Sequence, residues 1–162
     1  MSDKRKKIAV VGVGNILLSD EGIGVRAVEL LKERGVPEEV DLFDVGTSLD
    51  MVLSQLEGFD KMVILDAVKA GGEPGRIYRF SLKELEQGKK ENSGFMLSLH
   101  ELDIPRLLEL ERLVFKLPEE IVFIGMEPAS LSPGMELSEA INKRMNEFIK
   151  VIEQELGDKK GG

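Results

Sequence analysis

The sequence predicts an α/β fold in which helices cover both faces of one sheet. Five short apolar runs, each of strand length, alternate along the 162 residues with segments of helical periodicity. Most of these runs are apolar at every position, which is typical of strands buried on both faces of a parallel sheet. We therefore expect a three-layer α/β/α sandwich around a twisted, mostly parallel five-stranded sheet with one antiparallel edge strand.

The first half of the chain predicts three strands. Ile8–Val11 is a continuous apolar run of the kind expected for a central strand, and the helix that follows it ends at Gly35. Val40–Val45 alternates between apolar and polar residues and predicts a second strand, followed by a short helix over 48–56. Met62–Leu65 predicts a third, buried strand that leads directly into an aspartate.

The second half predicts two more strands. Arg76–Phe80 alternates in hydropathy, which favours a position at the edge of the sheet. A short helix over 81–87, a polar loop over Gly88–Gly94 and a leucine-rich helix over Leu102–Leu113 come next. Ile121–Ile124 predicts the last buried strand.

The C-terminal segment predicts a single long helix that ends at Gly157. Its apolar residues form one continuous face, made by Leu137, Ile141, Met145, Phe148, Ile149, Ile152 and Leu156. All these elements are expected to form one domain over residues 1–162, with a folded core over about 8–156 and flexible tails over 1–6 and 158–162.

The composition excludes several classes of function. A formal net charge of −8 argues against nucleic acid, since proteins that bind it present a basic face. No apolar run reaches the ~18 residues of a membrane span, and the basic N-terminus lacks a secretory cleavage pattern. We therefore expect a cytoplasmic protein with no membrane partner. The absence of cysteine excludes disulfides, thiolate metal ligands and a cysteine nucleophile.

The segment Gly12–Gly22 (GVGNILLSDEG) begins like a phosphate-binding loop but ends on two acids. Position 17 is leucine, so the GxGxxG pattern of dinucleotide-binding proteins fails. Gly12 and Gly14 are expected to allow close packing of the backbone. The GxxxxGK[ST], HExxH and GxSxG motifs are absent, so conventional hydrolase chemistry is poorly supported.

Polar side chains gather where the predicted strands end, which is where open α/β sheets bind their ligands. The single histidine of the sequence follows the polar loop, and that segment could fold over the same edge. Two carboxylates and one imidazole would form an incomplete coordination sphere for a divalent ion such as Ni²⁺ or Zn²⁺, leaving positions open for water or substrate. The candidate residues are Asn15, Asp20, Glu21, Asp44, Asp66 and His100.

Each candidate also has a purely structural explanation. Acids are favoured at the start of a helix by its dipole, which would account for Asp20 and Glu21. Asp44 and Asp66 could be turn or cap residues at strand ends, and a lone His100 could lie on the surface. The residues by themselves therefore indicate a metal or acid–base site and no particular reaction.

Five stretches, in matching order from about Ile8 to Leu156, resemble the hydrogenase maturation proteases. These stretches are GVGNILLSDEGIGVR, FDVGTS, VILDAV, the SLHE region and GMEPASLSPGMELS. In that family a twisted sheet lies between helices, and an acid, an aspartate and a histidine bind a metal. The resemblance implies that Glu21, Asp66 and His100 are both the metal ligands and the catalytic residues, with Asp20 and Asp44 as candidate helpers.

The resemblance also implies a function. The chain would be an endopeptidase that removes the C-terminal extension of a nickel–iron hydrogenase large-subunit precursor after nickel insertion. The nickel would be supplied by that precursor, while zinc or cadmium could occupy the site in crystals. We expect a monomer, because the protein must approach a large partner. Two alternatives stay open, a maturation chaperone that docks without cutting and a nucleotide-binding α/β domain that uses Gly12–Asn15.

Overall fold

The computed structural model describes residues 6–84 and 104–157. Its centre is a five-stranded sheet with strand order β2-β1-β3-β5-β4, in which β4 pairs antiparallel with β5 and all other neighbours are parallel. The predicted fold class is confirmed. The strands are β1 (Ile8–Val13), β2 (Val40–Gly46), β3 (Lys61–Ala67), β4 (Ile77–Ser81) and β5 (Glu120–Met126).

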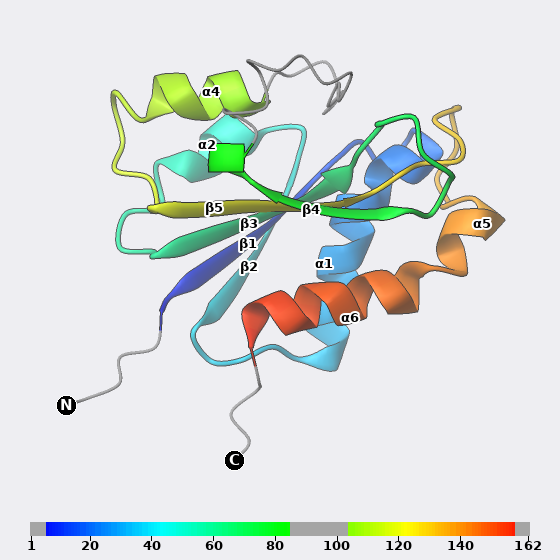
Figure 1. Ribbon diagram of the computed structural model, residues 1–162, viewed down its shortest axis with the longest axis horizontal. Coiled ribbons are helices and arrows are strands. Elements are labelled where there is room, and N and C mark those ends of the chain that lie inside the picture. The colour runs from blue at the N-terminus through cyan, green and yellow to red at the C-terminus, as the bar shows by residue number, and fades with distance from the viewer. Residues whose placement is uncertain (1–5, 85–103, 158–162) are drawn as a thin grey trace.

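Helices cover both faces of this sheet, as Figure 1 shows. Alternate residues of β1 point to opposite sides, so that Ile8 and Val10 pack with α1 and α6, while Ala9 and Val11 pack with α2 and α4. The result is the expected three-layer sandwich with two separate apolar cores. The helices are η1 (Ser19–Gly22), α1 (Ile23–Arg34), α2 (Leu49–Leu53), α4 (Ile104–Glu111), α5 (Glu139–Asn142) and α6 (Met145–Leu156).

The chain changes direction across the sheet between β1 and β3. From β1 it passes through α1 to β2 on one side, and then crosses to β3 on the other side of β1. In open α/β sheets such a switch point opens a crevice outside the carboxyl ends of the strands. The register pairs Gly12 of β1 with Leu65 of β3, so Asp66 lies at this end of the sheet.

Most predicted boundaries agree with the structure to within a few residues. The helix predicted over 48–56 is shorter, because α2 ends at Leu53 and turns lead on to Gly58. A helical turn begins after Ser81, whose hydroxyl accepts the Glu84 N–H at 3.1 Å while the Glu84 carboxylate accepts the Ser81 N–H at 2.7 Å. The rest of that predicted helix, the loop over Gly88–Gly94 and all but a residue or so of the predicted tails lie outside the described residues.

The single C-terminal helix predicted from the apolar pattern is wrong, because the segment forms two helices. The N–H of Arg144 bonds to the carbonyl of Ile141, three residues back, at 2.9 Å, and this tighter turn separates α5 from α6. Ile141 and Met145 remain buried on either side of the break. The apolar face therefore continues across a kink that the periodicity alone does not reveal. None of the described helices is long and apolar enough to cross a membrane.

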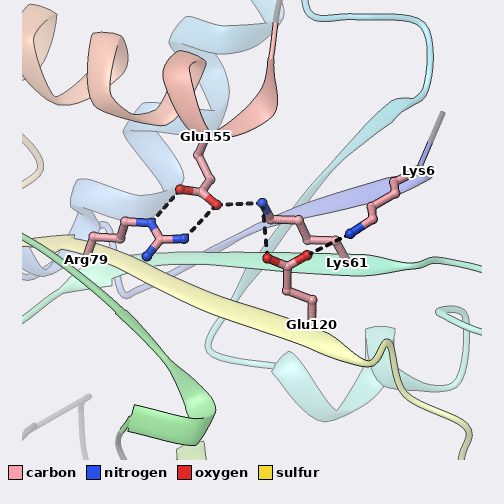
Figure 2. A network of polar contacts seen from close by, with 5 residues as sticks. All are labelled: Lys6, Lys61, Arg79, Glu120 and Glu155. Atoms are coloured by element: carbon pink, nitrogen blue, oxygen red, sulfur yellow. Dashed lines mark hydrogen bonds and ion pairs between the residues drawn. The ribbon is translucent and has the colours of Figure 1, made fainter.

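The opposite end of the sheet, where the parallel strands begin, is held by ion pairs (Figure 2). Glu155 of α6 accepts hydrogen bonds from the buried Lys61 of β3 and from Arg79 of β4, both at 2.5 Å. Glu120 of β5 lies 3.6 Å from Lys61 and 3.4 Å from Lys6. The hydrogen bonds from Arg79 and Lys61 favour the ionised carboxylate of Glu155, while burial opposes it. The net effect lowers the pKa of Glu155 to about 2. The network ties α6 to the first residues of two strands.

We expect Glu155→Gln to destabilise the protein in a pH-dependent way. The folded pKa of about 2 lies below the ordinary 4.5, so the stabilisation is complete above about pH 4.5 and is lost as the pH falls through about 2. This shift corresponds to about 3 kcal/mol, and the buried Lys61, which would keep only its 3.6 Å contact with Glu120, adds to the loss. Urea unfolding of the wild type and of Glu155→Gln at pH 7 and pH 3 measures the difference in their free energies of unfolding. Glu119→Gln, at an exposed glutamate, is the control. If the difference in free energy of unfolding were as large at pH 3 as at pH 7, the role given to the Glu155 ion pairs would be wrong.

Candidate active site

Asp66 lies at the carboxyl end of β3, beside the switch point of the sheet. It follows four buried apolar residues of the strand, and its own side chain is only 1% exposed. One carboxylate oxygen, Oδ1, accepts the N–H of Ala67 at 2.7 Å. A buried acid at such a strand end is placed for ligand binding.

Three glycines bring the turn that carries Glu21 against the same edge. A Cβ at Gly24 would lie 2.1 Å from the Leu65 carbonyl oxygen, and one at Gly12 would lie 2.5 Å from the Gly24 carbonyl oxygen. Gly14 has φ +146°, and a Cβ there would lie 2.0 Å from the carbonyl oxygen of Glu21. Only glycine permits these approaches, so the predicted role of the glycines in close packing is confirmed. They place η1 against the end of β3.

Glu21 is half-buried in η1, where its N–H bonds to the Leu18 carbonyl at 3.1 Å. Asp44 is exposed near the end of β2, opposite Gly12 of β1. Glu21, Asp44 and Asp66 therefore lie around the ends of three neighbouring strands, as the sequence predicts. Asn15 has a local role, because its side-chain oxygen accepts the N–H of Leu17 at 2.9 Å and fixes the turn between β1 and η1.

His100 lies outside the described residues. Within 6–84 and 104–157 no group of three or more histidine, aspartate or glutamate side chains is arranged to hold a metal. The part of the chain that the structure describes therefore supplies at most two of the three predicted ligands, Glu21 and Asp66. The ligand set as a whole stays a prediction.

Asp20, the neighbour of Glu21, is a buried anchor. It is 0% exposed, and its Oδ2 accepts the N–H groups of Ala129 and Ser130, both at 2.9 Å. Ser138 donates its N–H to Oδ1 at 2.7 Å and its hydroxyl to Oδ2 at 2.8 Å. Hydrogen bonds to an ionised carboxylate are among the stronger ones in proteins. Asp20 thus fixes η1 to the segment between β5 and α5, which Figure 1 shows beside the start of α1.

A second buried acid, Glu127, was missed by the sequence analysis. It follows β5, and its Oε1 accepts the N–H groups of Ala70 and Gly72, both at 3.0 Å, and the hydroxyl of Tyr78 at 2.7 Å. Burial alone would raise the pKa of Glu127. The hydrogen bonds from Tyr78 and the backbone lower it by a larger amount, so the net shift of the pKa is downward. Glu127 holds the turn between β3 and β4. Its position directly after a buried strand, like that of Asp66, was the available signal.

The candidate site is therefore the edge of the sheet at the switch point of a doubly wound α/β protein. Its glycine turn is closed by the backbone of η1, and Glu21 and Asp66 supply carboxylates at the switch point. Carboxylates attract cations and repel phosphate, so the geometry favours a cation over a nucleotide.

Comparison with known proteins identifies the family. The sequence model of the hydrogenase maturation proteases (HycI) matches residues 25–155, and the chain belongs to that family. It is 33% identical over 148 residues to the hydrogenase 2 maturation protease of Escherichia coli, covering 90% of this chain and 88% of that protein. It is 34% identical over 131 residues to the hydrogenase expression/formation protein HupD of Bradyrhizobium diazoefficiens, covering 80% and 67%.

The solved structures agree with this assignment. The hydrogenase maturating endopeptidase HybD of Escherichia coli superposes with a TM-score of 0.75 at 30% identity, over 90% of this chain and 89% of that one. A chain of this family and fold is a protease.

We expect Asp20→Asn to destabilise the protein strongly. The side-chain amide of asparagine would turn its own N–H groups towards N–H and O–H donors that now meet carboxylate oxygens. We expect this to lower the free energy of unfolding by about 2–4 kcal/mol. For a chain of this size that lowers the melting temperature by roughly 5–15 °C. Calorimetry measures the change, and Asp44→Asn, at an exposed carboxylate, serves as the matched control with an effect within about 0.5 kcal/mol. Equal melting temperatures for the two variants would show that Asp20 is no anchor.

Proposed function

We propose that this chain is the endopeptidase that removes the C-terminal extension of a nickel–iron hydrogenase large-subunit precursor once nickel has been inserted. Family membership supports the protease activity. The observation that carries the finer proposal is the placement of Glu21, on η1, against the end of β3 that bears Asp66. Two acids from distant parts of the sequence are thus brought to one edge of the sheet.

In this proposal Glu21, Asp66 and His100 bind the nickel that the precursor carries. Two carboxylate oxygens and one imidazole nitrogen suit a first-row divalent ion such as Ni²⁺. Three protein ligands leave coordination positions open, so the precursor can keep its own ligands on the same ion. The nickel is then part of the substrate.

The burial of Asp66 gives this recognition its selectivity. A cation close to a carboxylate that is only 1% exposed interacts with it through a medium of low dielectric constant, so the attraction is much stronger than in water. A precursor without nickel brings no cation to this carboxylate and gains none of this energy. Precursors with and without nickel are therefore distinguished by differential binding.

The bound ion would supply a Lewis acid that polarises the scissile carbonyl or activates a water molecule. Of the two candidate helpers, Asp44 is exposed at the same edge and is free to approach a substrate from outside. Asp20 has both oxygens engaged by the backbone N–H groups and the hydroxyl that it anchors. We therefore favour Asp44 as the residue that assists proton transfer.

The proposal is tested by incubating the purified protein with a large-subunit precursor that is either loaded with nickel or free of it. Loss of the C-terminal extension from the loaded precursor, measured by mass spectrometry, is the expected result. Binding of the precursor without any loss of mass would instead indicate a chaperone.

We expect Glu21→Gln, Asp66→Asn and His100→Ala each to lower kcat/KM for cleavage by about 100-fold or more, because each removes a ligand of the nickel. The melting temperatures should stay within a few degrees of the wild type for Glu21→Gln and His100→Ala. Isothermal titration with Ni²⁺ should show weaker binding by Asp66→Asn. Glu33→Gln, at an exposed glutamate of α1, is the matched control. Wild-type cleavage by any of the three would remove that residue from the mechanism.

A further inference from the structure

Two exposed apolar side chains lie in the segments next to η1. Leu17, in the turn before η1, is 56% exposed, and Met135, in the segment between β5 and α5, is 63% exposed. Other large apolar side chains that are exposed among the described residues belong to the face of the sheet covered by α2 and α4. These are Met51, Leu110, Leu113 and Val114.

Leu17 and Met135 are neighbours because the backbone joins their segments. The N–H of Gly134, directly before Met135, bonds to the carbonyl of Leu17 at 2.9 Å. The carbonyl of Met135 accepts a bond from Arg26 of α1 at 2.6 Å. Two residues that are 118 positions apart in the sequence are thus held in one fixed arrangement, which we name the apolar rim.

The apolar rim is rigid because both of its segments are anchored below the surface. Asp20 binds the backbone on either side of Met135, through Ser130 and Ser138. Ser19 adds a bond from its hydroxyl to the Ser132 carbonyl at 2.7 Å and one from its N–H to the Gly134 carbonyl at 2.9 Å. A surface that is already ordered loses little conformational entropy when a partner docks on it.

The apolar rim is also continuous with the residue that carries the chemistry. Leu18 follows Leu17, and its carbonyl accepts the N–H of Glu21 at 3.1 Å within one turn. A partner that contacts Glu21 is therefore within a few residues of Leu17 on the same turn. Exposed leucine and methionine at such a point gain free energy when they are covered by apolar groups of the partner.

We infer that the apolar rim, Leu17 and Met135, is a docking surface for an apolar segment of the hydrogenase precursor. The identity of this partner rests on the proposed function. The rim contributes uniform binding energy, because it contacts a part of the precursor that does not change during the reaction. Its loss should weaken substrate binding and leave the chemical step unchanged.

The experiment uses Leu17→Gln, Met135→Gln and the double variant in cleavage assays with nickel-loaded precursor. KM is expected to rise about threefold for each single variant and about tenfold for the double variant, with kcat unchanged. The rise should persist at high ionic strength, since apolar contacts are not screened by salt. Leu113→Gln, 83% exposed and remote from η1, is the matched control. All three substituted side chains are exposed, so the melting temperatures should not change.

Failure of the docking inference and failure of the proposed function give different results. If the wild type cleaves and the double variant has the KM of Leu113→Gln, the docking surface is wrong and the endopeptidase stands. If the wild type does not cleave, precursor binding is measured directly by biolayer interferometry. Weaker binding by the double variant than by the control then supports docking at the rim. Equal binding, or no binding by the wild type, overturns it.

Discussion

The carboxylate of Asp20 is the interaction on which the arrangement of the active-site edge depends. It is fully buried and accepts four hydrogen bonds from a segment more than 100 residues further along the chain. Together with the backbone bonds from Ser19 and Gly134, these bonds hold the turn before α1 against the segment after β5. Glu127 does the same for the turn between β3 and β4. Two buried acids therefore build the frame in which Glu21 and Asp66 are presented.

The two ends of the sheet divide stability from function. At the end where the parallel strands begin, Glu155 and Glu120 lie within ion-pair distance of Lys61, Arg79 and Lys6 (Figure 2). At the other end, η1 lies against the end of β3 and brings Glu21 to the edge of the sheet that carries Asp66.

The sheet and α1 could be predicted from sequence because strands buried on both faces leave an unmistakable apolar pattern. Glu21, Asp44 and Asp66 could be placed at one edge because parallel strands share a direction. The anchoring by Asp20 could not be predicted, since its donors are backbone N–H groups and Ser138, far away in the sequence. The break between α5 and α6 at Arg144 could not be predicted either, because a tightened turn leaves the apolar pattern of the sequence unchanged.

The distance along the chain that the Asp20 contacts span has a consequence for biosynthesis. Glu21 is made early, but the groups that fix its turn are not synthesised until Ser138 has been added. Contacts of such long sequence separation form late in folding. A nascent chain that lacks its last helices therefore carries the acids of a protease in an unassembled state. The edge that carries Glu21 is thus completed only after Ser138 has been made.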